Sequence, residues 1–137
     1  MVAAPTVMDP ADALPVRVAL EGRVERLSGD RMPGPGPRPQ AAAAPGRRVV
    51  AISGTLAAAG QPLWRQPLPL ARVLGSTLTD GAGRFRLELP PGTVTLLIEV
   101  PGGYWLNRFD GQGDYASVSL RPGLGPVLLL DDRGAIH

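Results

Sequence analysis

Few side chains in this sequence could serve as a nucleophile or as the base that activates one. The chain has 137 residues and no cysteine, and its one histidine is His137, the final residue. Serine and cysteine hydrolases use a base, most often histidine, that is held beside the nucleophile. Because chain ends are usually mobile, His137 is a poor candidate for such a base. We therefore expect neither serine nor cysteine hydrolase machinery.

Carboxylates are the remaining side chains that could catalyse a reaction. Asp110 and Asp114 form one pair that is close in sequence, and Asp131 and Asp132 form another. Either pair could act as general acid and general base, so a carboxylate-dependent hydrolase is one alternative. It is the least favoured of the alternatives. Each pair lies beside glycine in an expected turn, where aspartate is common for conformational reasons. The sequence therefore predicts no catalytic residues and a chain that is not an enzyme.

The segment from Asp110 to Asp114 also resembles the start of a calcium-binding loop. An EF-hand loop that begins at Asp110 would need its turn glycine where the chain has Tyr115, and its bidentate glutamate where the chain has Arg121. Zinc sites are usually built from histidine and cysteine, of which this chain holds one side chain in total. We therefore expect no metal site and no cofactor.

A cluster of aromatic residues is the best candidate for a contact surface. Four of the six aromatic side chains lie between positions 104 and 115, beside asparagine and arginine. Flat apolar rings next to oriented polar groups are typical of surfaces that bind a protein or a carbohydrate. The alternative is that the rings close the open end of a β-sandwich. The candidate ligand or partner contacts are Tyr104, Trp105, Asn107, Arg108, Phe109 and Tyr115.

The charge pattern argues against a nucleic-acid partner. All 14 basic residues are arginine, 12 acidic residues nearly balance them, and the net charge is +2. The arginines are spread along the chain, so no basic stripe follows a phosphate backbone.

No apolar run approaches the ~20 residues of a membrane-spanning helix, so we expect no membrane insertion. The first ten residues are not an intact secretion signal, so a periplasmic or cell-surface location requires a removed leader, and the alternative is the cytoplasm.

The elements that position these residues are expected to be short strands. With 18 glycines and 16 prolines, the chain disfavours helix interiors and favours many turns, which predicts an all-β fold. The length fits one domain. We expect an extended N-terminal segment at 1–14, a single β-sandwich domain at 15–131 and a tail at 132–137. A Pro-, Gly- and Ala-rich insertion at 28–47 is expected to be a long extended or disordered loop, and its length also makes it an interaction candidate.

Alternation of apolar and polar residues predicts the first strand, in which Val16, Val18, Leu20 and Val24 share one face. Further strands are expected at 48–56, 71–79, 115–120 and 126–130. Residues 61–70 carry three prolines around Trp64 and are expected to run extended along a sheet edge or across a sheet end.

The clearest local pattern is a hairpin that spans Thr79–Val100. Its turn contains one aspartate and two glycines between strand-like runs. In the strand that follows, Phe85, Leu87 and Leu89 alternate with charged residues. Pro90, Pro91 and Gly92 then make a second turn before a strand at 93–100, where we expect Thr95 to face outward and Leu97 to break the alternation. These two strands are expected to form the core.

The run at 79–96, Thr-Asp-Gly-Ala-Gly-Arg-Phe-Arg-Leu-Glu-Leu-Pro-Pro-Gly-Thr-Val-Thr-Leu, resembles the signature of carboxypeptidase regulatory-like domains, T-D-x-x-G-x-F followed by a strand and L-P-P-G-x-Y-x-L. Val94 replaces the common aromatic residue, and the insertion at 28–47 departs from typical members. The resemblance, which extends to bacterial stand-alone members, implies a transthyretin-like (prealbumin-like) Greek-key sandwich of two sheets with about seven strands. It also implies an accessory role and no peptidase activity. Transthyretin-like hydroxyisourate hydrolases rely on histidine, arginine and a Tyr-Arg-Gly-Ser ending, so that activity is not expected here.

Two function classes follow. The first is a non-catalytic binding or assembly module, expected in the bacterial envelope, that presents the aromatic-rich loop 104–115 to a protein or carbohydrate partner. The second is a structural accessory subunit that pairs through a sheet edge, either with another protein or as a homo-oligomer. Exposed rings favour the first class, and burial of the rings would remove its basis.

Overall fold

The computed structural model describes residues 16–30 and 40–136. The strands are β1 (Val18–Asp30), β2 (Gln40–Ala43), β3 (Arg48–Ser53), β4 (Leu63–Trp64), β5 (Val73–Leu78), β6 (Arg84–Leu89), β7 (Gly92–Val100), β8 (Gly103–Trp105), β9 (Val118–Leu120) and β10 (Val127–Ile136), and a short 3-10 turn, η1 (Leu70–Arg72), precedes β5. The expected N-terminal segment 1–14 and the middle of the expected insertion lie outside the described residues.

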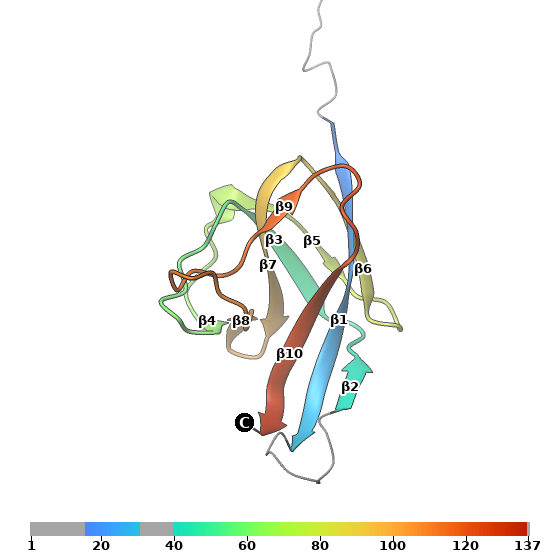
Figure 1. Ribbon diagram of the computed structural model, residues 1–137, viewed down its shortest axis with the longest axis vertical. Coiled ribbons are helices and arrows are strands. Elements are labelled where there is room, and N and C mark those ends of the chain that lie inside the picture. The colour runs from blue at the N-terminus through green and yellow to red at the C-terminus, as the bar shows by residue number, and fades with distance from the viewer. Residues whose placement is uncertain (1–15, 31–39, 137) are drawn as a thin grey trace, which may run out of the picture.

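The strands form two sheets that enclose a common core (Figure 1). In the first sheet, β1 lies between β10 on one side and β6 and β2 on the other. The second sheet has the order β4-β8-β7-β3-β5, and β9 also pairs with β7. The expected all-β sandwich of two sheets is therefore confirmed. The described residues contain ten strands, more than expected.

The first strand follows the predicted alternation. Val18, Leu20 and Val24 are at most 6% exposed, whereas Val16 precedes the strand and is 65% exposed, so its predicted burial is wrong. Gly22 lies where β6 and β10 both meet β1. A Cβ atom there would lie 2.6 Å from the Phe85 ring and from the Val127 side chain, so glycine allows the three strands to pack closely.

The predicted hairpin is in fact a connection between the two sheets. Phe85, Leu87 and Leu89 are buried as expected. However, β6 pairs with β1, and β7 pairs with β3, β8 and β9, so the two strands are not hydrogen-bonded to each other. Alternation predicts which face of a strand is buried, but it does not specify the neighbouring strand. The expected pairing is therefore wrong, although the expected turns are present.

The turn before β6 is held by its own side chains. The Asp80 carboxylate accepts hydrogen bonds from the backbone N–H groups of Ala82 and Arg84, each at 2.9 Å. Gly83 has a φ of +76°, and its carbonyl accepts a 2.8 Å hydrogen bond from the backbone N–H of Val24. The buried Thr79 hydroxyl donates to the carbonyl of Ala44 at 2.6 Å. Residues 79–83 thus connect β1 and the segment after β2 to the turn by which the chain passes from the second sheet to the first.

The second sheet is buried on both faces. Gly75 lies beside Leu87 and Leu89 and pairs with Ala51, which pairs with Leu96, so this face meets the first sheet. Thr95 and Leu97 lie on the opposite face and are also fully buried. We call the segments that bury this face the loop layer, residues 54–62 and 106–117. The Thr95 hydroxyl donates a 2.7 Å hydrogen bond to the carbonyl of Gly54, so its predicted outward position is wrong.

The end of the described chain is a strand and not the expected tail. β10 pairs in parallel with β1 as far as Ile136, and an irregularity in register between Asp131 and Gly134 accommodates the extra length. The expected insertion at 28–47 is shorter than predicted, because residues 28–30 continue β1 and β2 pairs antiparallel with it. Within the described residues, no helix is long and apolar enough to cross a membrane.

Candidate contact surface

The loop layer is ordered by backbone hydrogen bonds between its two segments. The N–H of Tyr115 donates to the carbonyl of Leu56 at 3.0 Å, and the N–H of Gly60 donates to that of Gly113 at 3.0 Å. The N–H of Leu106 donates to the carbonyl of Pro62 at 3.0 Å. The side chains of Leu56, Leu106 and Tyr115 are at most 4% exposed. The loop layer therefore belongs to the core and forms a firm base for any side chain it presents.

The four aromatic residues of this region divide into two groups. Tyr115 is 1% exposed and its hydroxyl has no hydrogen-bond partner among the described residues, and burial raises the pKa of this phenol to about 12. Phe109 stacks on it with ring centroids 5.9 Å apart. Tyr104, Trp105 and Phe109 are half-buried against the core. Tyr115 is thus a core residue, whereas the other three rings each keep an accessible part.

Two of these rings lie on the short strand β8. Trp105 pairs with Ile98 and with Leu63, and Tyr104 pairs with Trp64. The indole N–H groups of Trp64 and Trp105 are buried without a hydrogen-bond partner among the described residues. The segment around Trp64 is expected from the sequence to run extended along a sheet edge or across a sheet end, and its pairing with β8 forms a two-residue strand, β4, that is too short to show alternation.

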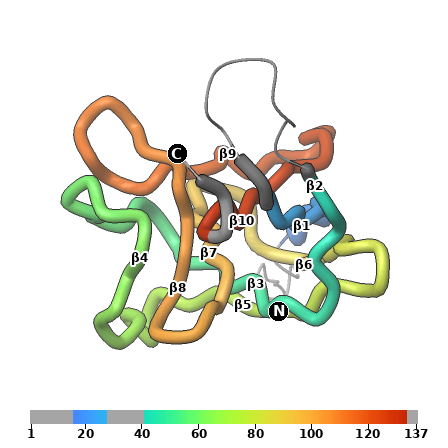
Figure 2. The backbone as a smooth tube through the Cα atoms, turned by 90° about the horizontal axis from the view of Figure 1, so that it is seen from below, coloured from blue at the N-terminus to red at the C-terminus, as the bar shows by residue number. Residues whose placement is uncertain are grey.

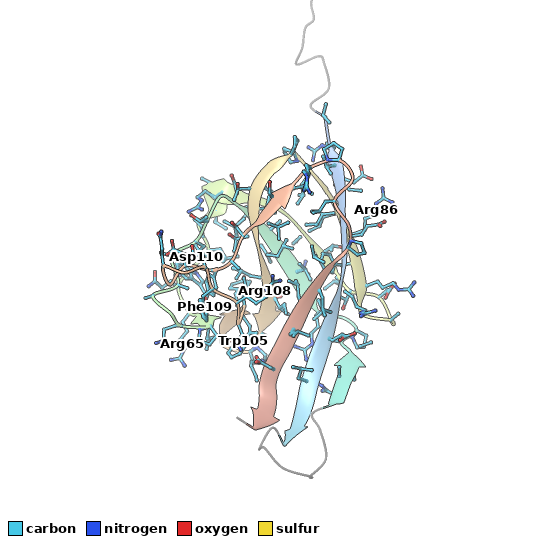
Figure 3. All side chains as sticks on the ribbon, in the orientation of Figure 1. Arg65, Arg86, Trp105, Arg108, Phe109 and Asp110 are labelled. Carbon is cyan, nitrogen blue, oxygen red and sulfur yellow. The ribbon has the colours of Figure 1, made fainter. Side chains whose placement is uncertain are left out.

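The polar residues beside the rings have different environments. The Asn107 side chain donates a 2.6 Å hydrogen bond to the carboxylate of Asp132, so it connects the loop layer to β10. Arg108 and Arg65 are exposed, and neither guanidinium makes an ion pair or side-chain hydrogen bond with the described residues. Figure 3 shows Arg65, Arg108, Trp105 and Phe109 on the side of the molecule opposite to Arg86.

We call Tyr104, Trp105, Phe109, Arg65 and Arg108 together the contact surface, in which Tyr104 and Trp105 lie on opposite faces of β8. Its rings come from the candidate set of the sequence analysis, and Arg65 is an addition. No sequence pattern predicted Arg65, because it follows a two-residue strand among prolines and its placement depends on the antiparallel pairing of β4 with β8. Tyr115 is excluded from this surface by its burial, whereas Asn107 is exposed and its side-chain amide is hydrogen-bonded to Asp132.

The first acidic pair belongs to a turn. One Asp110 carboxylate oxygen accepts hydrogen bonds from the backbone N–H of Gln112 at 2.7 Å and of Asp114 at 3.2 Å. This is the local role expected for aspartate beside glycine. The described residues hold no group of three or more potential metal ligands.

The second acidic pair is buried in β10, not in the expected turn. Asp131 is 1% exposed and accepts hydrogen bonds from Arg47 at 2.9 Å and from Arg133 at 2.7 and 2.8 Å. Burial raises the pKa of this carboxyl, but the hydrogen bonds and charge of Arg133 and the charge of Arg47 outweigh burial, so the net pKa is lowered. Asp132 is 5% exposed and accepts the Asn107 hydrogen bond. A carboxylate held by two arginines is suited to stabilise the fold, since proton transfer would disrupt both ion pairs.

Comparison of the chain with known protein families, with curated proteins and with solved structures finds no match to any of them.

Proposed function

We propose that this chain is a non-catalytic binding module that offers the contact surface to a protein or carbohydrate partner. The observation that carries the proposal is the combination of three partly accessible rings with two exposed guanidinium groups that have no partner among the described residues. Tyrosine, tryptophan and arginine are enriched in the residues that dominate binding energy at interfaces.

The base beneath this surface supports the same proposal. Phe109 stacks on the buried Tyr115, and the backbone carbonyl of Arg108 accepts a 3.0 Å hydrogen bond from the N–H of Ala116. A surface whose backbone is already fixed loses little conformational entropy when it binds. The buried carboxylates of Asp131 and Asp132 are held by hydrogen bonds, which suits them to a structural role.

A second part of the proposal concerns the family to which the chain belongs. We propose that the chain is a carboxypeptidase regulatory-like domain with a transthyretin-like Greek-key topology, of the stand-alone bacterial kind, and that it acts in the envelope. Its support is that Thr79, Asp80, Gly83 and Phe85, the residues that carry the resemblance, each have a defined structural role at the crossing between the sheets.

Affinity capture with the purified chain as bait, together with a glycan array, tests the proposed function. Arg65→Ala combined with Arg108→Ala is expected to weaken capture of the partner by about five-fold or more, because each guanidinium would otherwise contact the partner. Arg121→Ala is the matched control, since Arg121 is also exposed and makes no side-chain contact with the described residues.

Each variant should keep the thermal midpoint of the parent chain, because no folded contact is removed. A partner that binds the double variant and the parent equally would exclude this surface. Equal losses for the double variant and for Arg121→Ala would indicate nonspecific attraction to positive charge.

A structural accessory role through a sheet edge is the second candidate. The observation that favours it is β5, an edge strand that among the described strands pairs only with β3 and that contains no charged residue and no proline. Charges and prolines are the usual means by which edge strands avoid pairing with other chains.

A further inference from the structure

The free edge of β5 has a defined set of unpaired backbone groups. The N–H and the carbonyl of Thr79 both bond toward the segment before β3, at 2.8 and 3.1 Å. Because antiparallel strands alternate the direction of these groups, Thr77 and Gly75 also face β3, whereas Ser76 and Leu78 face away from it. No described strand pairs with that edge. Ser76 and Leu78 therefore present two N–H donors and two carbonyl acceptors.

The open edge is short and its side chains are apolar or uncharged. A register irregularity at Leu74 interrupts the ladder with β3, so the regular edge runs from Gly75 to Leu78. Leu78 is 54% exposed. An uncharged sheet edge with a large exposed aliphatic side chain can readily pair with an added strand.

A groove of about 720 Å³ lies beside this edge. It is lined by Thr77 and Leu78 of β5 and by residues 21–23 of β1, 84–86 of β6 and 126–128 at the start of β10. Phe85 and Val127 give it apolar walls around Gly22, where a side chain would collide with both. Figure 2 places β6 on the opposite side of the molecule from β4 and β8, so the groove is separate from the contact surface.

The charged side chains along the groove differ in how closely they are paired. Arg23 pairs with Glu25 at 2.8 Å, and Arg86 pairs with Glu88 at 3.1 Å and with Glu21 at 3.8 Å. The Asp80 carboxylate is occupied by the backbone N–H groups of its own turn. The guanidinium of Arg84 is exposed and makes no ion pair or hydrogen bond with the described residues, and its charge interacts with the carboxylate of Asp80 in the same turn. A carboxylate is the group that complements it best.

We propose that β5 and this groove form a binding site for an extended peptide of another protein, which adds a strand to the edge of β5, places an apolar side chain in the groove and sets a carboxylate against Arg84. The proposal goes beyond the contact surface and gives the edge-pairing candidate a place and a ligand chemistry. A second copy of the chain fits less well, because β5 carries no carboxylate and Asp80 is engaged in its own turn.

The test uses fluorescein-labelled heptapeptides in which threonine alternates with valine or leucine, each prepared with a C-terminal glutamate and with the matching glutamine. Fluorescence anisotropy with the full chain is expected to give about ten-fold tighter binding for the glutamate peptide, the effect of one charge-assisted pair. Arg84→Gln should remove this preference and leave the binding of the glutamine peptide unchanged. Arg121→Gln, the matched control, should retain the preference.

Backbone N-methylation of the same peptides tests the edge. Methylating alternate residues on the side that faces β5 should abolish binding, whereas methylating the other residues should not. A preference for glutamate that survives in Arg84→Gln, or binding that neither methylation pattern affects, would overturn the proposal. Light scattering that reveals a dimer, together with peptide binding that weakens as the dimer forms, would assign the β5 edge to a second copy and would also overturn the proposal. Binding that is sensitive to methylation but indifferent to glutamate would retain edge pairing and refute the carboxylate site. None of these results depends on Arg65 or Arg108, so the peptide site and the contact surface can be tested independently of each other.

Discussion

Single residues in this protein have roles that their types alone do not reveal. Tyr115 carries a hydroxyl, yet it is packed as an apolar ring without a hydrogen-bond partner among the described residues. Asp131 is a carboxylate, yet it serves as an anchor for two arginines from different parts of the chain. In both cases the burial of the side chain determines its effect on stability.

Tyr115→Phe is expected to make the protein resistant to alkali. The folded pKa of about 12 lies above the ordinary value of 10, so the folded state holds this proton more tightly. Stability is unaffected below pH 10 and falls as the pH rises from 10 toward 12, because the unfolded chain ionises first. Thermal midpoints measured from pH 8 to 11.5 should therefore fall more steeply for the parent chain than for Tyr115→Phe.

The half-buried Tyr104 supplies the control for this experiment. Tyr104→Phe should leave the alkaline decline as it is in the parent chain. If Tyr115→Phe declines as steeply as the parent, ionisation of this phenol does not drive the loss of stability.

Asp131→Asn is expected to reduce the free energy of unfolding by about 2–4 kcal/mol at pH 7, since it leaves Arg47 and Arg133 without their shared carboxylate. The folded pKa is lowered below the ordinary 3.8, so the stability this carboxylate contributes is complete above that value. It is lost as the pH falls through the folded pKa. Urea unfolding at pH 7 and at pH 2.5 should show a large difference between variant and parent at pH 7 and a smaller one at pH 2.5.

Asp110→Asn provides the comparison, because Asp110 is exposed and serves only its own turn. Its effect should be small at both pH values. A difference between Asp131→Asn and the parent that stays constant with pH would contradict the assigned role of the ionised carboxylate.

At the scale of elements, the turn between β5 and β6 determines how the chain passes from one sheet to the other. Its glycines are not equivalent. A Cβ atom at Gly83 would lie 2.6 Å from the carbonyl oxygen of Val24, at a φ of +76°, whereas one at Gly81 would meet nothing within 4 Å. The required backbone conformation and the close approach to β1 act together at Gly83.

Gly83→Ala is therefore expected to lower the free energy of unfolding by about 2 kcal/mol or more, and Gly81→Ala to change it by less than about 0.5 kcal/mol. Urea denaturation of the two variants measures this contrast. Similar losses for both would mean that the turn depends on general flexibility and not on the contact of Gly83 with β1.

At the scale of the whole molecule, the loop layer gives the second sheet a covered outer face. Residues 54–62 and 106–117 carry no long strand, yet Gly54 accepts a hydrogen bond from the buried Thr95, and Leu56, Ala58, Leu106 and Tyr115 belong to the core. The protein therefore has three layers, of which two are sheets. The contact surface takes Arg108 and Phe109 from the loop layer and the other three residues from β8 and the end of β4, whereas the groove is lined by residues of β1, β5, β6 and β10.

Leu56→Ala is expected to cost about 2–4 kcal/mol of unfolding free energy, comparable to Leu87→Ala between the sheets, since both side chains are buried. Chemical denaturation of both variants, followed by fluorescence of the two tryptophans, measures these losses. A cost near zero for Leu56→Ala, with a normal cost for Leu87→Ala, would show that the loop layer is peripheral to the fold.

The sequence by itself determined the class of the fold and much of its local structure. The alternation in β6 predicted the burial of Phe85, Leu87 and Leu89, and the Asp-Gly composition predicted the turn before it. These features depend on short-range properties: side chains alternate along any strand, and aspartate and glycine favour turns through their own geometry.

Only the tertiary structure decided which strands pair and which polar groups are buried. The pairing of β6 with β1 and of β7 with β3, the hydrogen bond between Thr95 and Gly54 and the ion pair between Arg47 and Asp131 all join residues that are distant in sequence. The same holds for the candidate sites, because the pairing of β4 with β8 brings the segment that carries Arg65 beside the strand that carries Tyr104 and Trp105, and the groove is lined by four separate strands. Burial depends on what covers a residue, and that covering comes from parts of the chain that no local pattern describes.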